Sequence, residues 1–233
     1  FPGLLHARGI GRRVWSAVES SHYTDKECQD YLNENVLALL GLASGQENQP
    51  LSDDIKRRLG LFHANRCTID RAKLDNGMTL LEAAVRAEHV DLLTFLFDTL
   101  GLSVNLPLDD LGRSAFHYAV EYNQSEALLM LLLKRGADIN QADFRGQSVF
   151  FSLLQGNYTM NDSVIRFRFL HDQGGDPEQV SGLLQHFLTV IVDRCLMNIA
   201  PSVRSDCIEM LGLLMSSFSV ETRYLISLYL NEI

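Results

Sequence analysis

The chain has 233 residues, of which 46% are hydrophobic and 21% are charged, and its formal net charge is −9. This length and composition are typical of a globular protein with a sizeable core. The acidic balance argues against nucleic-acid binding, because phosphate contacts need a concentrated basic surface. The short basic clusters Arg12-Arg13 and Lys56-Arg57-Arg58 do not change this, since such runs are typical of solvated helix faces.

Residues 1–73 are predicted to form an N-terminal helical region. Apolar side chains recur at helical spacing over residues 25–43, with Asp25 as the expected N-cap. After a polar loop, residues 52–64 predict a second amphipathic helix. Its apolar side holds Ile55, Leu59 and Phe62. Two interpretations stay open for this region, a divergent capping repeat or an unrelated helical cap.

Three consecutive stretches then repeat with a period near 34 residues. Their leading glycines, Gly77, Gly112 and Gly146, are 35 and 34 residues apart. A Thr or Ser two residues after each glycine can accept a backbone N–H at a helix start. These expected caps are Thr79, Ser114 and Ser148. The predicted units are residues 74–107, 108–141 and 142–177.

Each unit has the pattern of two helices joined by a turn. The first helix contains small residues, such as Ala83-Ala84 and Ala119, which allow neighbouring helices to approach closely. The second helix has a broad apolar stripe, as in the run Leu128 to Leu132. The third unit has about four extra residues, and we expect them to lengthen the turn between its helices around residues 156–162.

The central unit resembles the ankyrin repeat. Gly112, Ser114, Phe116, His117 and Ala119 fall on the family's G-x-T-P-L-H-x-A pattern, and the run LLKRGADIN that ends at Asn140 is similar to the family's repeat ending. The units depart from the pattern at two positions. The Pro is replaced by Leu80, Ala115 and Val149, and the His by Glu82 and Phe151 in the outer units.

This resemblance covers residues 74–177 and implies an all-α fold. The expected architecture is an ankyrin-repeat solenoid of stacked helix-turn-helix units with short β-hairpin tips, of which Asn140 to Gly146 is one. Such a stack needs capping regions at both ends, because each repeat has two apolar faces.

Residues 178–233 predict a C-terminal helical region of three helices. The first covers residues 178–198, the second starts at Pro201, and a break at Ser217 to Glu221 precedes the third. The region is either a degenerate repeat with a capping helix or a separate helical domain. We expect no membrane insertion, because the uncharged stretch Gln179 to Val192 is too short to span a bilayer.

The four cysteines, Cys28, Cys67, Cys195 and Cys207, include no C-x-x-C pair, so no zinc site is predicted. Their apolar neighbours and the absence of a secretory signal favour reduced, buried thiols. We therefore expect a cytoplasmic location, or the host cytosol for a pathogen effector. The chain begins with Phe1 instead of Met, so we expect it to be part of a longer protein.

Ser114 and His117 are the sharpest candidates for catalysis, since a Ser-His-Asp site needs these residue types. A pair of Cys28 with His22 or His63 is an alternative that no flanking motif supports. No nucleophile elbow surrounds Ser114. The resemblance implies instead that the two side chains bond to each other and to the backbone, bracing adjacent repeats. No histidine pair has metal-binding spacing and no phosphate loop is present. We predict no catalytic residue, metal site, cofactor or small-molecule substrate, and therefore no enzyme in this chain.

In the ankyrin family, hairpin tips and first helices contact protein partners. The residues at these positions are Asn76, Met78, Arg86, Leu111, Arg113, Glu121, Tyr122, Phe144, Arg145 and Gln147. Phe144 is the most informative, because a Phe at a hairpin tip has little core to enter. The alternative is that its ring folds back onto Leu108 or Leu111.

The predicted function is that of a non-catalytic protein-protein interaction module within a longer protein. Its partner is another protein or another domain of the parent chain. The alternative is an intramolecular scaffold that docks on a catalytic domain of the same parent, which includes a pathogen effector with its activity outside the repeats.

Overall fold

The computed structural model describes residues 24–32, 50–64, 67, 69, 73, 77–156, 158–180, 201–224 and 227. These residues form an all-α structure, and no strand is present among them. The chain divides into two compact units, Phe1–Asp109 and Asp110–Ile233. The expected hairpin tips are turns in the described residues, accompanied by one isolated bridge between Lys73 and Thr79.

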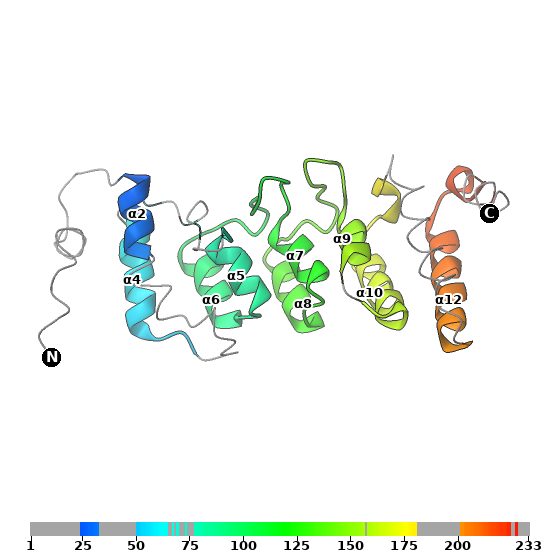
Figure 1. The fold of residues 1–233 in the computed structure, drawn as a ribbon, viewed down its shortest axis with the longest axis horizontal. Helices are drawn as coiled ribbons and strands as arrows, with labels where there is room; N and C mark the ends of the chain where they lie inside the picture. The colour runs from blue at the N-terminus through cyan, green and yellow to red at the C-terminus, as the bar shows by residue number, and fades with distance from the viewer. Residues whose placement is uncertain are drawn as a thin grey trace, which may run out of the picture. The chain divides into compact units, whose positions relative to one another are not determined.

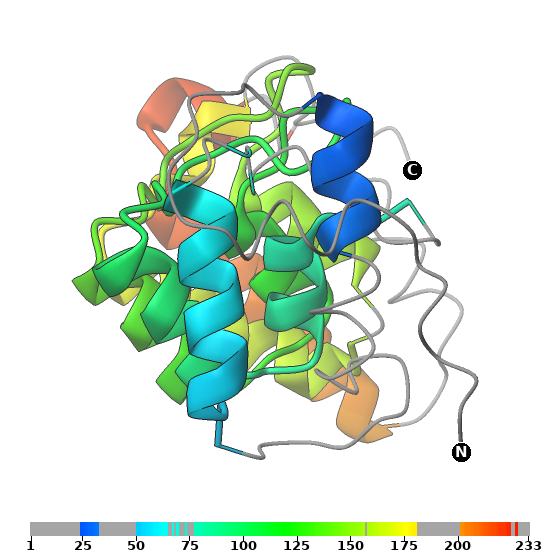
Figure 2. The ribbon, with the colours of Figure 1, turned by 90° about the vertical axis from the view of Figure 1, so that its left-hand side faces the viewer.

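The first unit contains two described helix pairs. Helices α2 (Asp25–Leu32) and α4 (Asp53–Ala64) pack against each other and are the blue and cyan helices of Figure 2. Helix α5 (Leu80–Arg86) packs against α6 (Val90–Thr94), which continues into the π-helical turn η2 (Phe95–Thr99). The predicted apolar side of α4 is confirmed, since Ile55, Leu59 and Phe62 are all buried.

Helix α2 begins one residue earlier than the sequence predicted. The cap is Thr24 and not Asp25, because Thr24 Oγ1 accepts a hydrogen bond from the Glu27 N–H at 3.3 Å. In return, Glu27 Oε2 accepts from the Thr24 N–H at 2.9 Å. This reciprocal pair satisfies two backbone donors at once, which a cap at Asp25 would not do. The predicted continuation over residues 33–43 lies outside the described residues.

The expectation of reduced cysteines is wrong for the three that the structure describes. Cys28 and Cys67 form a disulfide across a sequence separation of 39 residues, with their Cα atoms 5.6 Å apart. Cys207 is disulfide-bonded as well, and Cys195 lies outside the described residues. The packing of α2 against α4 brings Cys28 to the segment that follows α4, and no local spacing in the sequence announces this contact.

The second unit stacks its helices in pairs (Figure 1). Helix α7 (Ala115–Glu121) packs on α8 (Glu126–Lys134), and α9 (Val149–Gln155) packs on α10 (Met160–Asp172). The two pairs meet through α7 and α9, and α10 contacts α12 (Pro201–Ser217). The core between the helices of the second pair includes Phe150 and Phe167, whose ring centroids are 5.0 Å apart.

The extra residues of the third repeat lie in α10 and not in the turn before it. The turns α7–α8 and α9–α10 are equally long, whereas α10 has 13 residues and α8 has 9. The predicted longer turn is therefore wrong. Four residues add about one helical turn, so the buried face of α10 keeps its register. That face holds Val164, Phe167 and Leu170.

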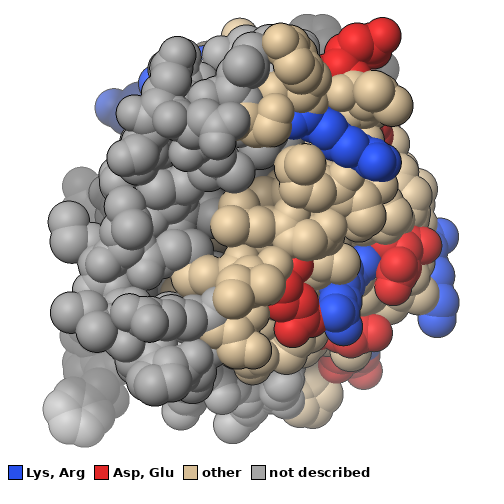
Figure 3. Space-filling model, turned by 90° about the vertical axis from the view of Figure 1, so that its right-hand side faces the viewer, with Lys and Arg blue, Asp and Glu red and all other residues tan. Residues whose placement is uncertain are grey.

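The C-terminal helices follow the predicted breaks. Helix α12 starts at Pro201 and ends at Ser217, and Ser219 Oγ accepts from the Thr222 N–H at 3.3 Å where the next helical residues begin. The 3₁₀ turn η3 (Pro177–Val180) opens the first predicted helix, whose remainder lies outside the described residues. On the face that Figure 3 shows, basic and acidic side chains lie next to each other. In the described part of the chain, no helix is long and apolar enough to cross a membrane.

Candidate interaction surface

The tip between the second and third repeats is closed around Asp143. The Asp143 N–H donates to the Gln147 carbonyl at 2.9 Å, and Asp143 Oδ1 accepts from the backbone N–H groups of Arg145 and Gln147 at 2.9 and 2.7 Å. Gly146 has φ +77°, a conformation that is cheap for glycine. These bonds fix the tip backbone, so the side chains of Phe144 and Arg145 extend from an ordered turn, and both are exposed.

Phe144 rests against the neighbouring tip and still faces solvent. Its N–H donates to the Leu111 carbonyl at 2.8 Å, which joins the two tips. Its ring lies over Gly112, where an added Cβ would be 2.5 Å from the ring atom Cδ1. The side chain nevertheless remains 73% exposed. The alternative in which the ring folds back onto Leu108 or Leu111 and becomes buried is therefore wrong.

Arg113, Glu121 and Tyr122 belong to one side-chain cluster. Arg113 forms an ion pair with Glu121, donates to the Tyr118 hydroxyl at 2.9 Å, and places its guanidinium 4.4 Å from the Tyr118 ring centroid. Tyr118 in turn stacks on Tyr122, with centroids 5.5 Å apart. Tyr118 was not among the predicted residues. Tyr118 on α7 and Tyr122, which follows the helix, are four residues apart, and this spacing is the signal that marks Tyr118.

The predicted residues of the first unit form a smaller contact. Arg86 Nη1 lies 3.7 Å from the sulfur of Met78, and Arg86 is exposed while Met78 is half-buried. Asn76 lies outside the described residues. The structure thus brings Met78 to Arg86 in the first unit, and it brings Leu111 to Phe144 in the second.

Ser114 and His117 are helix-start residues beneath the surface. His117 Nδ1 accepts from the Ser114 N–H at 3.2 Å and lies 2.9 Å from Ser114 Oγ, which makes a reciprocal capping box. The two residues are 0% and 2% exposed, so the pair is covered by protein. The resemblance implied that the two side chains bond to each other and to the backbone, and the structure shows such bonds at the start of α7. The implied bracing of adjacent repeats by this pair stays a prediction. In the residues described, no group of three potential metal ligands occurs.

The three expected caps behave differently. Thr79 Oγ1 accepts from the Glu82 N–H at 3.1 Å, as predicted. Ser148 does not cap, since the Phe151 N–H donates to the Ser148 carbonyl at 2.9 Å instead of to its hydroxyl. The third unit has Phe151 where the second has His117, so no imidazole is available to the Ser148 hydroxyl. That oxygen is buried without a hydrogen-bond partner in the structure.

Three described helix pairs recur at a spacing near 34 residues, each opened by a positive-φ glycine and a Thr or Ser, and they define a helical repeat protein. Residues 40–143, a little less than half of the chain, are similar to the family model "Ankyrin repeats (3 copies)". A 142-residue stretch is 27% identical to a protein of Rickettsia felis (strain ATCC VR-1525 / URRWXCal2) whose name describes it as an ankyrin repeat protein.

The alignment with the Rickettsia protein covers 59% of this chain and 36% of the relative. The chain therefore spans about a third of that relative's length. The family match begins at residue 40, within the predicted N-terminal region, and ends where the third predicted unit begins. Ankyrin repeats are generally protein-interaction modules and are typically non-catalytic.

Proposed function

We propose that the second unit binds a partner protein through its tip surface, which comprises Leu111, Arg113, Glu121, Tyr122, Phe144, Arg145 and Gln147. The observation that carries the proposal is the exposed Phe144 ring, held by an ordered tip. Burial of such a ring in a complex is favourable by about 1.5–3 kcal/mol. Because the tip backbone is fixed by its own hydrogen bonds, little conformational entropy is lost on binding.

The side-chain cluster of Arg113, Glu121, Tyr118 and Tyr122 supports the surface next to the tip. Arg113 is already engaged by Glu121 and by the buried Tyr118, so the half-buried side chains of Arg113 and Tyr122 are held in defined positions. Aromatic side chains, including Tyr and Phe, and Arg are enriched in protein interfaces. Arg145 is exposed and carries a positive charge next to Phe144, which suits a carboxylate beside an apolar side chain in the partner. The proposed function includes no catalytic step, cofactor or small-molecule substrate.

A second candidate partner is another domain of the same parent chain. The observation that favours it is the alignment, which covers only 36% of the Rickettsia relative. A domain in the parent that occupies the tip surface would reduce binding of a separate partner. Comparing the affinity of the parent protein with that of this chain discriminates the two cases, because equal affinities exclude docking in cis.

The expected cytoplasmic location loses its support in this structure. That expectation rested on reduced thiols, whereas Cys28, Cys67 and Cys207 are disulfide-bonded. Disulfides persist mainly in oxidising compartments. The proposal therefore places the module where its cysteines can be oxidised.

The first test is binding by tip variants. Proteins retained from the native source by the wild-type chain are compared with those retained by Phe144→Ala, Arg145→Ala and the control Ile208→Ala. Ile208 is 71% exposed in the same unit, so its truncation removes a comparable exposed apolar side chain away from the tip. For the partner so identified, we expect Phe144→Ala to weaken affinity by about tenfold or more. Equal affinities for Phe144→Ala and Ile208→Ala would contradict the proposal.

A second test displaces the ring without removing it. Gly112→Ala introduces a Cβ against Phe144, and the control Gly136→Ala introduces one where no atom lies within 4 Å. Both glycines have φ near +80°, so the backbone strain is matched at about 1–2 kcal/mol. We expect the affinity for the partner to fall in Gly112→Ala and to stay close to wild type in Gly136→Ala.

A further inference from the structure

Helix α2 packs against α4 within the first unit. Its described part, Asp25–Leu32, is eight residues long. Among its described side chains, Lys26 is exposed and Asp30 is half-buried, whereas Cys28 and Leu32 are buried. One aliphatic side chain and one cysteine therefore make the described buried face of this helix.

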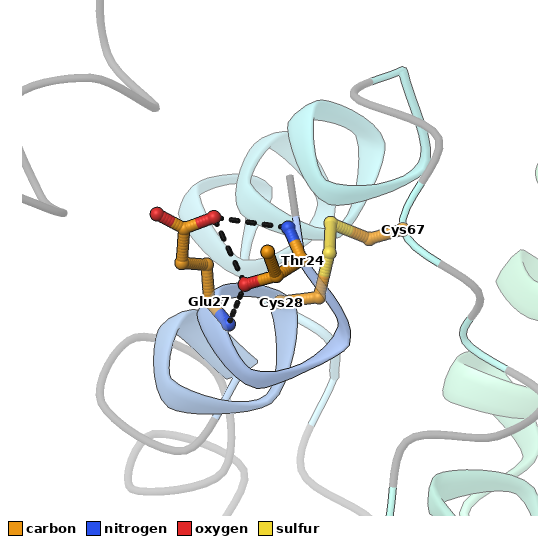
Figure 4. Close-up of a disulfide and its surroundings, with 4 residues drawn as sticks. All are labelled: Thr24, Glu27, Cys28 and Cys67. Carbon is orange, nitrogen blue, oxygen red and sulfur yellow. Dashed lines mark hydrogen bonds between the residues drawn. A yellow bond between two sulfur atoms is a disulfide. The ribbon is translucent and has the colours of Figure 1, made fainter. Parts of the chain in front are cut away.

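The disulfide provides the covalent part of that attachment. Figure 4 shows Cys28 on α2 reaching Cys67, which follows α4, beside the capping residues Thr24 and Glu27. Cys67 is held at the end of α4, since its N–H donates to the Phe62 carbonyl at 3.3 Å. The bond thus connects the short helix to a point that α4 fixes. The capping bonds order only the first turn of α2 and do not join it to α4.

We propose that the Cys28–Cys67 disulfide is a redox latch that keeps α2 docked on α4. When Cys28 and Cys67 form the disulfide, α2 stays packed on α4 and covers part of its apolar side. When it is reduced, α2 is released, and the apolar side of α4 loses part of its cover. The device is independent of the tip surface, which lies in the second unit.

The chemistry is thiol-disulfide exchange. In oxidation, the two thiols lose two electrons and two protons to an external disulfide, which leaves as two thiols. In reduction, one thiolate of an external dithiol attacks one sulfur and releases the other cysteine as a thiol. The second thiolate then attacks the mixed disulfide and releases the remaining cysteine, and the reductant leaves as its own disulfide. Cys28 and Cys67 are 9% and 7% exposed, so a reductant reaches the bond when α2 opens. Reduction and release of α2 are therefore coupled.

The test is hydrogen exchange on the full chain, followed by mass spectrometry of peptides from α2 and α5. We compare the oxidised protein with the protein held in excess dithiothreitol, and alkylation verifies that Cys28 and Cys67 are free. The expected result is that amides of residues 25–32 exchange on the order of tenfold faster or more after reduction. Amides of residues 80–86 should keep their rates.

Two variants separate the latch from other effects of the reductant. Cys28→Ser with Cys67→Ser should show fast exchange in α2 without reductant and no further response to it. The control, Cys195→Ser with Cys207→Ser, should keep α2 slow until reductant is added. Unchanged protection of α2 with both thiols free overturns the proposal. Loss of protection throughout α5, or failure of the first variant to fold, also overturns it, because the bond would then hold the whole unit.

Discussion

At the scale of single residues, the helix-start hydroxyls show how one substitution changes a cap. Ser114 shares its hydrogen bonds with His117, whereas the Ser148 hydroxyl has Phe151 as its neighbour and no partner. A buried polar group without a hydrogen bond costs free energy, and a bonded one stabilises the helix start.

This difference predicts opposite effects of the same change. Ser114→Ala should lower the free energy of unfolding by about 1–2 kcal/mol, because it removes the partner of His117 Nδ1. Ser148→Ala should leave the free energy of unfolding unchanged or raise it by up to about 1 kcal/mol. The reason is that the substitution removes a buried hydroxyl without breaking a hydrogen bond. Urea unfolding followed by circular dichroism measures both. A loss in Ser148→Ala as large as that in Ser114→Ala would show that Ser148 is capped in solution.

Tyr158 is expected to make the stability of the folded protein depend on pH in the alkaline range. Its hydroxyl donates to the Val120 carbonyl, and burial raises the pKa of Tyr158 from 10.0 to about 12. The unfolded chain therefore loses this proton near pH 10, while the folded protein keeps it until about pH 12. Stability from this group is complete below pH 10 and decreases as the pH rises through this window, by about 1.4 kcal/mol per pH unit.

The corresponding experiment measures urea midpoints from pH 9 to pH 12. Tyr158→Phe should be less stable at neutral pH by about 1 kcal/mol, because the hydrogen bond is lost, and its alkaline decrease should be shallower than in the wild type. Tyr224→Phe is the matched control, since Tyr224 is 63% exposed, and it should keep the wild-type slope. Identical slopes for Tyr158→Phe and the wild type would exclude this assignment.

At the scale of elements, the second and third repeats are tied together at both ends of their helices. On the side of the closing turns, Asn140 Nδ2 donates to the Gly174 carbonyl at 3.1 Å, and Asn140 Oδ1 accepts from the Asp176 N–H at 2.7 Å. At the other end, Arg166 Nη2 donates to the Gln124 carbonyl at 2.7 Å. Each tie joins backbone of one repeat to a side chain of its neighbour, so the pair acts as one block.

Removing the hydrogen bonds of Asn140 should weaken the contact between the second and third repeats. Asn140→Ala deletes a donor and an acceptor at once, and we expect a loss of about 1–2 kcal/mol in the free energy of unfolding of the second unit. Asn161→Ala, an exposed position on α10, is the control and should change it by less than about 0.5 kcal/mol. Differential scanning calorimetry of the two variants compares them directly. Equal losses would mean that the Asn140 bonds are replaced by water at no cost.

The elements also show which features were predictable from the sequence. The helices of the repeats could be predicted, because a positive-φ glycine, a hydroxyl cap and apolar spacing are local signals. The extra helical turn of α10 could not be predicted, since four added residues fit a loop and a helix equally well. The ion pair of Arg113 with Glu121 depends on how a turn folds back beside α7, and the sequence placed these residues at the surface without joining them.

At the scale of the whole molecule, the cysteine pairing also could not be predicted from the sequence. A separation of 39 residues between Cys28 and Cys67 has no local signature, and the pairing depends on the packing of α2 with α4. The position of Phe144 in a turn could be predicted, because repeat register locates the turn residues by counting, and the binding role of the tip surface stays a prediction. Its exposure and its support by Gly112 depend on contacts between two tips, which only the folded chain shows.

The net charge of the 233 residues leads to a prediction for their solubility. The formal charge of the chain is −9 at pH 7 and its pI is about 5.2, and mutual repulsion at neutral pH opposes self-association. As the pH falls towards 5, the seven histidines become protonated and a small part of the 29 carboxylates binds protons, so the net charge approaches zero. Exposed apolar side chains, such as Phe144 and Val220, then meet without an electrostatic barrier. We therefore expect solubility to pass through a minimum near pH 5 and to recover below it as the net charge becomes positive.

Light scattering between pH 4 and pH 8 at low ionic strength measures this minimum, with circular dichroism at each pH as the control for unfolding. Phe144→Ala should scatter less than the wild type at the minimum, because one exposed ring is removed while the charge is unchanged. Solubility that continues to fall below pH 5 with an intact helical spectrum would contradict the prediction. Such a result would mean that association is driven by protonated carboxyl groups and not by loss of the net charge.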